Sequence, residues 1–229
     1  MRPEVFHVKQ PGPEPAPPGD PLPAAAMPVA PSLVPDAATL ERLDRLLELL
    51  VRWNGRINLV AERDAETIRR RHVEDSLQLL PLLPPGTGPV GDLGSGGGFP
   101  GLVLAAAATR PFHLVEADRR KAAFLTDAAA RLGLGHVTVH PARIEAVRLP
   151  PLSALTARAL APLEDLLPHA ARLLAPDGVA VFPKGRGAQA ELEAAHRSWA
   201  MQVERFASRT APDATILRLS GIRRASPDA

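Results

Sequence analysis

The stretch that decides the fold is Val90-Gly91-Asp92-Leu93-Gly94-Ser95-Gly96-Gly97-Gly98-Phe99-Pro100-Gly101. A short apolar run leads into an acid and then into glycines on alternate positions, before an apolar helical segment begins. Glycine adopts positive φ without strain and lets a ligand approach the backbone closely. The helix that follows offers free N–H groups and the positive end of its dipole. The stretch therefore predicts a strand–turn–helix unit that binds a nucleotide-like cofactor.

Two cofactors fit this turn. Residues 96–101 match the dinucleotide fingerprint G-x-G-x-x-G, which binds NAD. Residues 92–98 match D-x-G-x-G-x-G, a motif of enzymes that use S-adenosylmethionine (SAM). This second interpretation accounts for the acid and for Gly94, Gly96 and Gly98, and it puts Asp92 near a cationic methionyl moiety. A P-loop is excluded because no Gly-Lys-Ser/Thr follows. The pattern favours SAM, while a turn without a ligand stays an alternative.

Composition excludes several classes of protein. The 27 basic residues include only three lysines, so the chain is rich in arginine at a formal net charge of +2. Arginine suits phosphates and bases, which allows an RNA partner, although a GC-rich genome would give the same bias. The absence of cysteine excludes disulfides, cysteine–zinc sites and thiolate nucleophiles. The seven histidines show no paired ligand spacing, so we expect no metal. No apolar run reaches the ~20 residues that span a bilayer, and we expect no membrane and a cytoplasmic location.

The chain divides into a tail and one domain. Residues 1–35 hold 11 of the 26 prolines and predict a disordered tail. Residues 36–229 form the predicted domain, with a helical cap over 36–84 and a Rossmann-like core over 85–229. Leucines at helical spacing predict a helix over 36–53 with Asp36 as its N-cap, and a second helix over 64–83.

From residue 85 onward, strands and helices alternate. We predict strands at 89–93, 112–116, 136–140, 152–157 and 178–183, and helices at 100–109, 119–132, 162–174 and 187–198. This alternation predicts a parallel α/β sheet covered on both faces. Two further apolar runs, 201–208 and 214–221, are separated by a short break and predict a hairpin whose last strand is antiparallel. A mostly parallel seven-stranded sheet with that ending is typical of SAM-dependent methyltransferases and atypical of NAD-binding domains.

Other predicted cofactor contacts follow the next two strands. Glu116 ends a strand where a doubly wound fold places an acid for the ribose hydroxyls, and Asp118 is a weaker candidate. Alternatively, Glu116 caps the next helix. Phe99 packs on the cofactor or fills the core. The backbone N–H of Ile144 and the carboxylate of Glu145 suit an adenine, although a helix N-terminus there is an equal alternative.

The fourth strand ends in Thr156-Ala157-Arg158-Ala159-Leu160-Ala161, without the Asp/Asn-Pro-Pro-Tyr/Phe motif that methylates amino groups. Arginine suits a nucleophile with a free lone pair, such as guanine N7, because positioning then suffices. We predict that Arg158 binds phosphate, guanine O6 or the cofactor; an ion pair with Asp92 or Glu164 is the alternative. Lys184 ends the fifth strand and is predicted to contact phosphate, or else to be merely solvated. Arg158 and Lys184 are the predicted catalytic residues.

Several motifs together resemble one known family, the bacterial small-subunit ribosomal RNA guanine-N7 methyltransferases, also called glucose-inhibited division protein B. The resemblance covers roughly residues 36–221. Two positions depart from the family pattern, with Ile57 where Tyr is frequent and Leu160 where Phe is usual. The motifs are Trp53-Asn54…Asn58-Leu59, Arg71-His72…Asp75-Ser76, Asp92–Gly101, Thr156-Ala157-Arg158-Ala159 and Lys184-Gly185.

The resemblance implies a SAM-dependent class I fold and methylation of one guanine N7 in a 16S rRNA loop near the decoding site. It implies SAM contacts at the positions of Gly94, Phe99, Ile144, Glu145 and Arg158. We expect a monomer that binds 16S rRNA or a small-subunit particle over Arg158, Lys184, Arg186 and Arg197. The alternatives are an NAD-dependent oxidoreductase and a non-catalytic RNA-binding module.

The Arg-His-x-x-Asp-Ser motif carries a separate structural expectation. On a regular helix Arg71 pairs with Asp75 at i+4, and His72 neighbours Asp75 and Ser76. Attack by N7 needs no base, so we expect His72 to support the cofactor pocket rather than to contact RNA.

Overall fold

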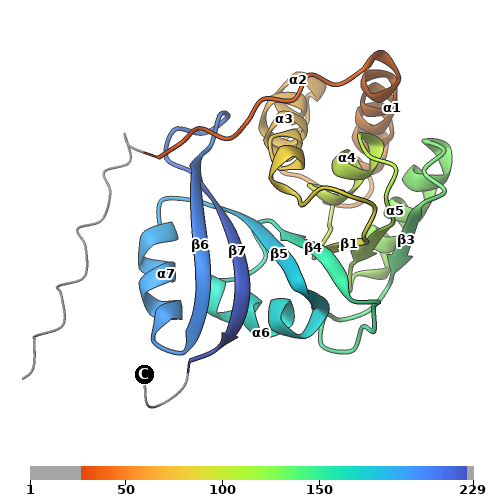
Figure 1. Ribbon diagram of the computed structural model, residues 1–229. Coiled ribbons are helices and arrows are strands. Elements are labelled where there is room, and N and C mark those ends of the chain that lie inside the picture. The colour runs from red at the N-terminus through yellow and green to blue at the C-terminus, as the bar shows by residue number, and fades with distance from the viewer. Residues whose placement is uncertain (1–26, 226–229) are drawn as a thin grey trace, which may run out of the picture.

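A seven-stranded sheet forms the centre of the protein (Figure 1), whose computed structural model describes residues 27–225. The strand order is β3-β2-β1-β4-β5-β7-β6, and β7 alone runs antiparallel to its neighbours. The strands are β1 (Val90–Leu93), β2 (Phe112–Val115), β3 (Val137–His140), β4 (Leu152–Ala157), β5 (Leu174–Lys184), β6 (Trp199–Ala207) and β7 (Thr215–Arg224). The predicted α/β architecture with a reversed C-terminal strand is confirmed. Strand β5 begins at Leu174, earlier than the predicted 178.

Helices cover both faces of the sheet, so that the protein has two cores. Helices α1 (Ala37–Asn54), α4 (Gly101–Ala106) and α5 (Arg119–Arg131) contribute to one core, while α6 (Leu163–Leu173) and α7 (Ala188–His196) contribute to the other. Because successive side chains of a strand point to opposite faces, β5 serves both cores. Val179 and Val181 lie in the first core, and Ala180 and Phe182 lie in the second. This explains why the central strands read as continuous apolar runs.

Helix α1 begins where the sequence predicts. The Asp36 carboxylate accepts a hydrogen bond from Thr39 N at 2.7 Å and so caps the helix. One face is buried and the opposite face carries charge, as its leucine spacing requires. The buried leucines are Leu43, Leu46, Leu47, Leu49 and Leu50.

The predicted second helix begins where expected, with Asp64 accepting from Thr67 N, but it does not continue to residue 83 as one regular α-helix. The structure has α2 (Ala65–Ile68), a π-helical turn (Arg69–Val73), α3 (Glu74–Leu77) and a 3-10 turn (Leu80–Leu82). A π turn closes i→i+5 hydrogen bonds, so it changes the direction of side chains across it. The i+4 spacing that predicted an Arg71–Asp75 pair therefore does not hold, and the two side chains take different partners.

The chain is ordered before the predicted boundary at residue 36. Val29 forms a parallel bridge with Ala207, flanked by hydrogen bonds from Ala30 N to Ala207 O (3.0 Å) and from Ala207 N to Pro28 O (2.9 Å). Ala30 is buried in the first core. Figure 1 shows this segment passing from the end of β6 to α1. The predicted disordered tail is thus wrong for residues 27–35, and residues 1–26 lie outside the described residues.

Two further structural findings concern residues 27–225 only. None of their helices is both long and apolar enough to cross a membrane. They contain no group of three or more His, Asp or Glu side chains arranged to hold a metal ion.

Candidate active site

The turn between β1 and α4 requires glycine at defined positions. Gly94, Gly96 and Gly98 have φ values of +65°, +51° and +88°, which L side chains rarely adopt. Gly101 is needed for packing, because a Cβ there would lie 2.4 Å from Leu114 Cδ2 and 2.6 Å from a carboxylate oxygen of Asp92. The alternating glycines thus shape the backbone, while the last glycine lets α4 approach the sheet.

Glu116 lies directly beside this turn, at the end of β2. Its carboxylate accepts hydrogen bonds from Gly96 N (2.9 Å) and from Asp118 N (2.8 Å). Each oxygen keeps a further lone pair, so the group fits a ribose diol. Asp118 caps α5 by accepting from the backbone N–H groups of Arg120 and Lys121. The capping role considered for Glu116 therefore belongs to Asp118.

Asp92 is completely buried beneath the turn. Its carboxylate accepts from Gly101 N at 3.2 Å and from Thr156 Oγ1 at 2.7 Å, so it connects β1, α4 and β4. Burial raises the pKa of Asp92 to about 6, against the effect of these hydrogen bonds. Its predicted contact with a methionyl moiety stays a prediction.

The segment after β3 is a turn rather than a helix, so the alternative of a helix N-terminus at Glu145 is wrong. Ile144 is partly buried and Glu145 is exposed at this turn. Arg172 of α6 donates hydrogen bonds to the carbonyls of Ile144 and Val147. The turn is thereby fixed beside the end of β3, and its adenine contacts stay a prediction.

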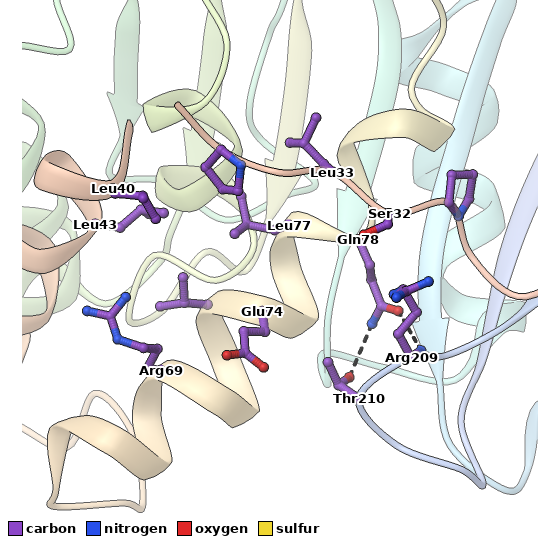
Figure 2. A pocket seen from close by; sticks show the side chains of 13 residues that line it. Ser32, Leu33, Leu40, Leu43, Arg69, Glu74, Leu77, Gln78, Arg209 and Thr210 are labelled. Carbon is purple, nitrogen blue, oxygen red and sulfur yellow. Dashed lines mark hydrogen bonds between the residues drawn. The ribbon is translucent and has the colours of Figure 1, made fainter. Parts of the chain in front are cut away.

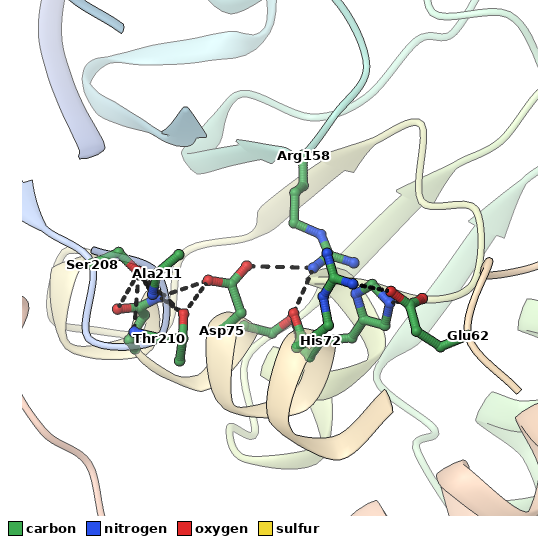
Figure 3. A network of polar contacts seen from close by, with 10 residues as sticks. Glu62, His72, Asp75, Arg158, Ser208, Thr210 and Ala211 are labelled. Carbon is green, nitrogen blue, oxygen red and sulfur yellow. Dashed lines mark hydrogen bonds and ion pairs between the residues drawn. The ribbon is translucent and has the colours of Figure 1, made fainter. Parts of the chain in front are cut away.

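Arg158 follows β4 and joins two parts of the site. Its Nη1 lies 3.3 Å from Asp75 Oδ2, and its guanidinium carbon lies 5.4 Å from the centre of the Phe99 ring. Both members of the Arg158–Asp75 pair are mostly buried, with side chains 18% and 17% exposed. Figure 3 shows the guanidinium between Asp75 and the His72 ring. The considered ion pairs of Arg158 with Asp92 or Glu164 are not formed, because Asp75 takes that place.

His72 contacts the Phe99 ring and pairs with Glu62, a partner that the sequence did not predict. His72 stacks on the Phe99 ring at 5.1 Å between centres, and its Nε2 lies 2.8 Å from Glu62 Oε2. Burial lowers the pKa of His72, while the hydrogen bond to His72 lowers the pKa of Glu62. Arg71 pairs with the other Glu62 oxygen at 3.0 Å instead of with Asp75.

Glu62 could have been found from Asn54, which belongs to the Trp53-Asn54 motif and binds the loop that carries Glu62. Its buried amide donates to the carbonyls of Val60 (3.1 Å) and Glu62 (3.0 Å), and its oxygen accepts from the N–H groups of Leu59 (2.8 Å) and Val60 (3.1 Å). Asn54 therefore folds the loop that carries Glu62. The same loop lies against the glycine turn, since a Cβ on Gly97 would come within 3.2 Å of Leu59 O.

A second missed network ties α3 to the β6–β7 turn. Asp75 Oδ1 accepts from Thr210 Oγ1 (2.7 Å) and Gln78 Nε2 (2.8 Å), and the side-chain oxygen Oε1 of Gln78 accepts from Arg209 N (2.9 Å). Ser208 Oγ lies 3.1 Å from Gln78 Nε2. Figure 2 shows Gln78 reaching Thr210. Both residues line a cavity of about 420 Å³, which Pro31–Leu33, Pro35 and α1 also line. The network joins residues that are about 130 positions apart in the sequence, so no local sequence pattern could predict it.

The alternative of a merely solvated Lys184 is wrong, and its predicted contact with phosphate stays a prediction. Its side chain is only 8% exposed, and Nζ lies 2.8 Å from both Glu191 Oε2 and the Ala161 carbonyl. Arg186 is exposed and pairs with Asp213 at 3.0 Å. Arg197 follows the far end of α7, which runs back from the carboxyl end of β5, so it lies away from the other predicted residues.

The carboxyl ends of β4 and β5 border a cavity of about 720 Å³. Arg158 and Asp75 lie on one wall and the Lys184–Glu191 pair lies on another. The β6–β7 turn forms a third wall. The lining residues are Arg71, Asp75, Arg158–Pro162, Pro183–Gly185, Glu191, Thr210, Ala211 and Ala214. Because Arg158 also lies on Phe99, the cavity adjoins the glycine turn. The arrangement suits a cofactor at the turn and a second substrate in the cavity.

Two solved structures with a similar fold are methyltransferases. A SAM-dependent methyltransferase from Aquifex aeolicus matches with a TM-score of 0.55 and 14% identity, covering 67% of this chain and 92% of that one. An O-methyltransferase from Bacillus cereus in complex with SAH matches with a TM-score of 0.54 and 15% identity, covering 82% and 93%. These likenesses establish the class I methyltransferase fold.

Sequence comparison is more specific. Relatives named ribosomal RNA small subunit methyltransferase G occur in Granulibacter bethesdensis (55% identity over 81% of this chain and 87% of the relative) and Acidiphilium cryptum (56% over 80% and 86%). The family model for rRNA small subunit methyltransferase G matches residues 39–215. These matches favour the SAM interpretation of the glycine turn over the NAD interpretation. The chain belongs to the rRNA small subunit methyltransferase G family and is a SAM-dependent methyltransferase.

Proposed function

We propose that this protein methylates N7 of a single guanine in 16S rRNA, within a small ribosomal subunit or its RNA, as the family resemblance implies. The observation that carries the proposal is the position of Arg158. This arginine contacts the Phe99 ring beside the glycine turn and also lines the 720 Å³ cavity. A base in that cavity would therefore lie next to the methyl donor.

The residues at the turn fit SAM. The backbone of Gly94 to Gly98 and the Phe99 ring would hold the methionyl side. The Glu116 carboxylate, which accepts from Gly96 N, would also accept from the ribose hydroxyls. Ile144 and Glu145 lie beyond β3, where the adenine would extend. Bound SAM supplies an electrophilic methyl group on a sulfonium sulfur.

The side chains of the cavity suit guanine N7 as the acceptor. N7 carries a free lone pair and would form the new bond to the methyl carbon as the carbon–sulfur bond breaks. The neutral thioether S-adenosylhomocysteine would leave and the base would take the positive charge, so no proton is released and the protein needs no general base. Its task is to hold the base in line with the methyl group. Arg158 donates to guanine O6, which lies on the same edge of the base as N7. The partly buried Lys184–Glu191 pair forms another wall of the cavity.

The substrate must present this guanine outside a helix. The major groove of A-form RNA, where N7 lies, is deep and narrow and excludes side chains. Enzymes that modify bases take them out of the stack or act on unpaired positions. The chain has a low net charge of +2. This favours recognition of a local RNA shape over binding along a long RNA helix, which would need a broad basic surface.

The test is methylation of small ribosomal subunits that lack this modification. After incubation with the protein and SAM, nucleosides of the 16S rRNA are analysed by mass spectrometry and the modified position is mapped. We expect 7-methylguanosine at one position, with slower reaction of protein-free helical RNA. No methyl incorporation by a protein that binds SAM would refute the proposed acceptor. Binding of NADH without SAM would support an oxidoreductase instead.

A further inference from the structure

The ion pair of Arg158 and Asp75 presents a hydrogen-bond donor and an acceptor side by side on one wall of the cavity. We propose that this pair reads the O6 and N1–H groups of the target guanine, and that Asp75 thereby selects guanine over adenine. The inference rests on the proposed function, since it assigns a specificity residue to the same site.

The two oxygens of Asp75 have different roles. Oδ1 accepts from both Thr210 Oγ1 and Gln78 Nε2, at 2.7 and 2.8 Å, which uses its two lone pairs. Oδ2 has a single long contact of 3.3 Å, to Arg158 Nη1. One acceptor position on Oδ2 therefore remains for a ligand in the cavity.

This arrangement matches guanine and opposes adenine. Guanine presents O6 as an acceptor and N1–H as a donor on neighbouring atoms, so O6 faces Arg158 and N1–H faces Asp75. Adenine presents the reverse pattern, with an amino donor at C6 and an acceptor at N1. It would bring two donors together at Arg158 and two acceptors together at Asp75, which costs free energy in a desolvated site.

The order of contacts also agrees with attack by N7. Arg158 lies over Phe99, beside the glycine turn, and Asp75 lies on the side of Thr210 (Figure 3). In guanine N7 is followed by C5, C6 with its O6, and N1 around the ring. A base with N7 toward the turn therefore places O6 near Arg158 and N1–H near Asp75.

Asp75 is held ready for this role. Gln78 is only 4% exposed and also binds Arg209 N and Ser208 Oγ, so the amide that orients the carboxylate is itself fixed. Fixed groups lose little entropy on binding, which improves discrimination between bases.

The experiment compares Asp75→Asn with the unaltered protein on two substrates. Small subunits are assembled with 16S rRNA that carries either guanosine or 2,6-diaminopurine riboside at the target. Diaminopurine keeps N7 and the 2-amino group but reverses the groups at C6 and N1. The measured quantity is kcat/KM on each substrate, together with SAM affinity and melting temperature.

For the unaltered protein we expect a strong preference for guanosine. Asp75→Asn should lower kcat/KM on guanosine about 10- to 100-fold, with a smaller loss on diaminopurine, because an amide can turn its N–H toward N1. The ratio of the two rates should therefore narrow while SAM affinity is retained. An equal loss on both substrates, or none on guanosine, would overturn the proposal. Failure of the unaltered protein to methylate the guanosine particle would instead count against the proposed function.

Thr210→Val is the matched control. It removes the hydroxyl that orients Asp75 Oδ1 but keeps the carboxylate and the shape of the side chain. We expect a modest loss of rate with an unchanged preference for guanosine. A preference that collapses in this variant would mean that orientation of the turn, rather than the carboxylate, selects the base.

Discussion

The two halves of the site are built in different ways. The donor half consists of the turn over residues 92–101 and of Glu116, and its geometry is set by backbone torsions and by hydrogen bonds from backbone N–H groups to the Asp92 and Glu116 carboxylates. The acceptor half brings together Asp75, Arg158 and the β6–β7 turn through side-chain contacts across 83 to 135 residues. The donor half therefore depends on its glycines and on the two carboxylates that its backbone N–H groups contact. A site made from distant side chains depends on each partner.

The largest expected effect tests the junction between the halves. Arg158→Ala removes the group that contacts Phe99 and Asp75, and it leaves a mostly buried carboxylate without its cation. We expect methyl transfer to fall by about 100-fold or more in a folded protein. Activity on small subunits, with circular dichroism as the check on folding, measures this.

Arg158→Lys separates charge from shape. Lysine keeps the positive charge but not the planar fork that donates in two directions. Relative to Arg158→Ala, we expect Arg158→Lys to recover more of the free energy of unfolding than of the methyl-transfer rate. Full activity of the alanine variant would remove Arg158 from the mechanism and make the two halves independent.

The donor half is tested by a pair of glycine substitutions. In Gly101→Ala the new Cβ would overlap Leu114 and Asp92, whereas in Gly96→Ala the nearest atom is Gly94 O at 3.7 Å. Overpacking in a core costs about 1–3 kcal/mol, so Gly101→Ala should unfold at lower urea concentration. Gly96→Ala meets no overlap and has only the strain of a positive φ, about 1 kcal/mol. Equal destabilisation would show that torsion rather than space limits this turn.

The buried carboxylate beneath the turn predicts a dependence on pH. The pKa of Asp92 is about 6 in the folded protein against 3.8 as the ordinary value. The folded state therefore binds the proton more tightly, and the free energy of unfolding falls as pH rises from about 4 to about 6, then levels off. At about 1.4 kcal/mol per pKa unit, the change is about 2 kcal/mol between pH 4.5 and 7.

Asp92→Asn isolates this contribution. The amide can accept from Gly101 N and donate to Thr156 Oγ1, so the contacts of the carboxylate survive in a neutral group. Urea unfolding at several pH values gives the free energy of unfolding of both proteins. In the difference between the two values, the contributions of other titrating groups cancel. We expect the unaltered protein to gain stability relative to the variant on acidification. A difference that is constant with pH would contradict the raised pKa.

The difference between the two halves also explains which structural features could be predicted from the sequence. The glycine spacing, the strand–helix alternation and the apolar runs are local, so they predicted the sheet, the turn and the helix cap at Asp36. The partners of Arg158 and Lys184 depend on tertiary packing, and the predictions there were wrong or incomplete. The π turn at 69–73 is the clearest case, because a single register change redirects Arg71 to Glu62 and leaves Asp75 for Arg158.

The smallest expected effect places the same chemical change in each half. Ser95 Oγ donates to Asp92 O at 3.0 Å in the donor half, and Ser208 Oγ lies 3.1 Å from Gln78 Nε2 in the acceptor half. Replacing either serine by alanine removes a hydrogen bond that contributes about 1 kcal/mol.

Ser95→Ala should weaken SAM binding with little change in KM for the small subunit, because it loosens the turn alone. Ser208→Ala should raise that KM and leave SAM affinity unchanged, since it loosens the wall that orients Asp75. Calorimetry with SAM and initial rates against particle concentration distinguish the two variants. If both variants changed both constants equally, the halves would behave as one mechanical unit despite their separate construction.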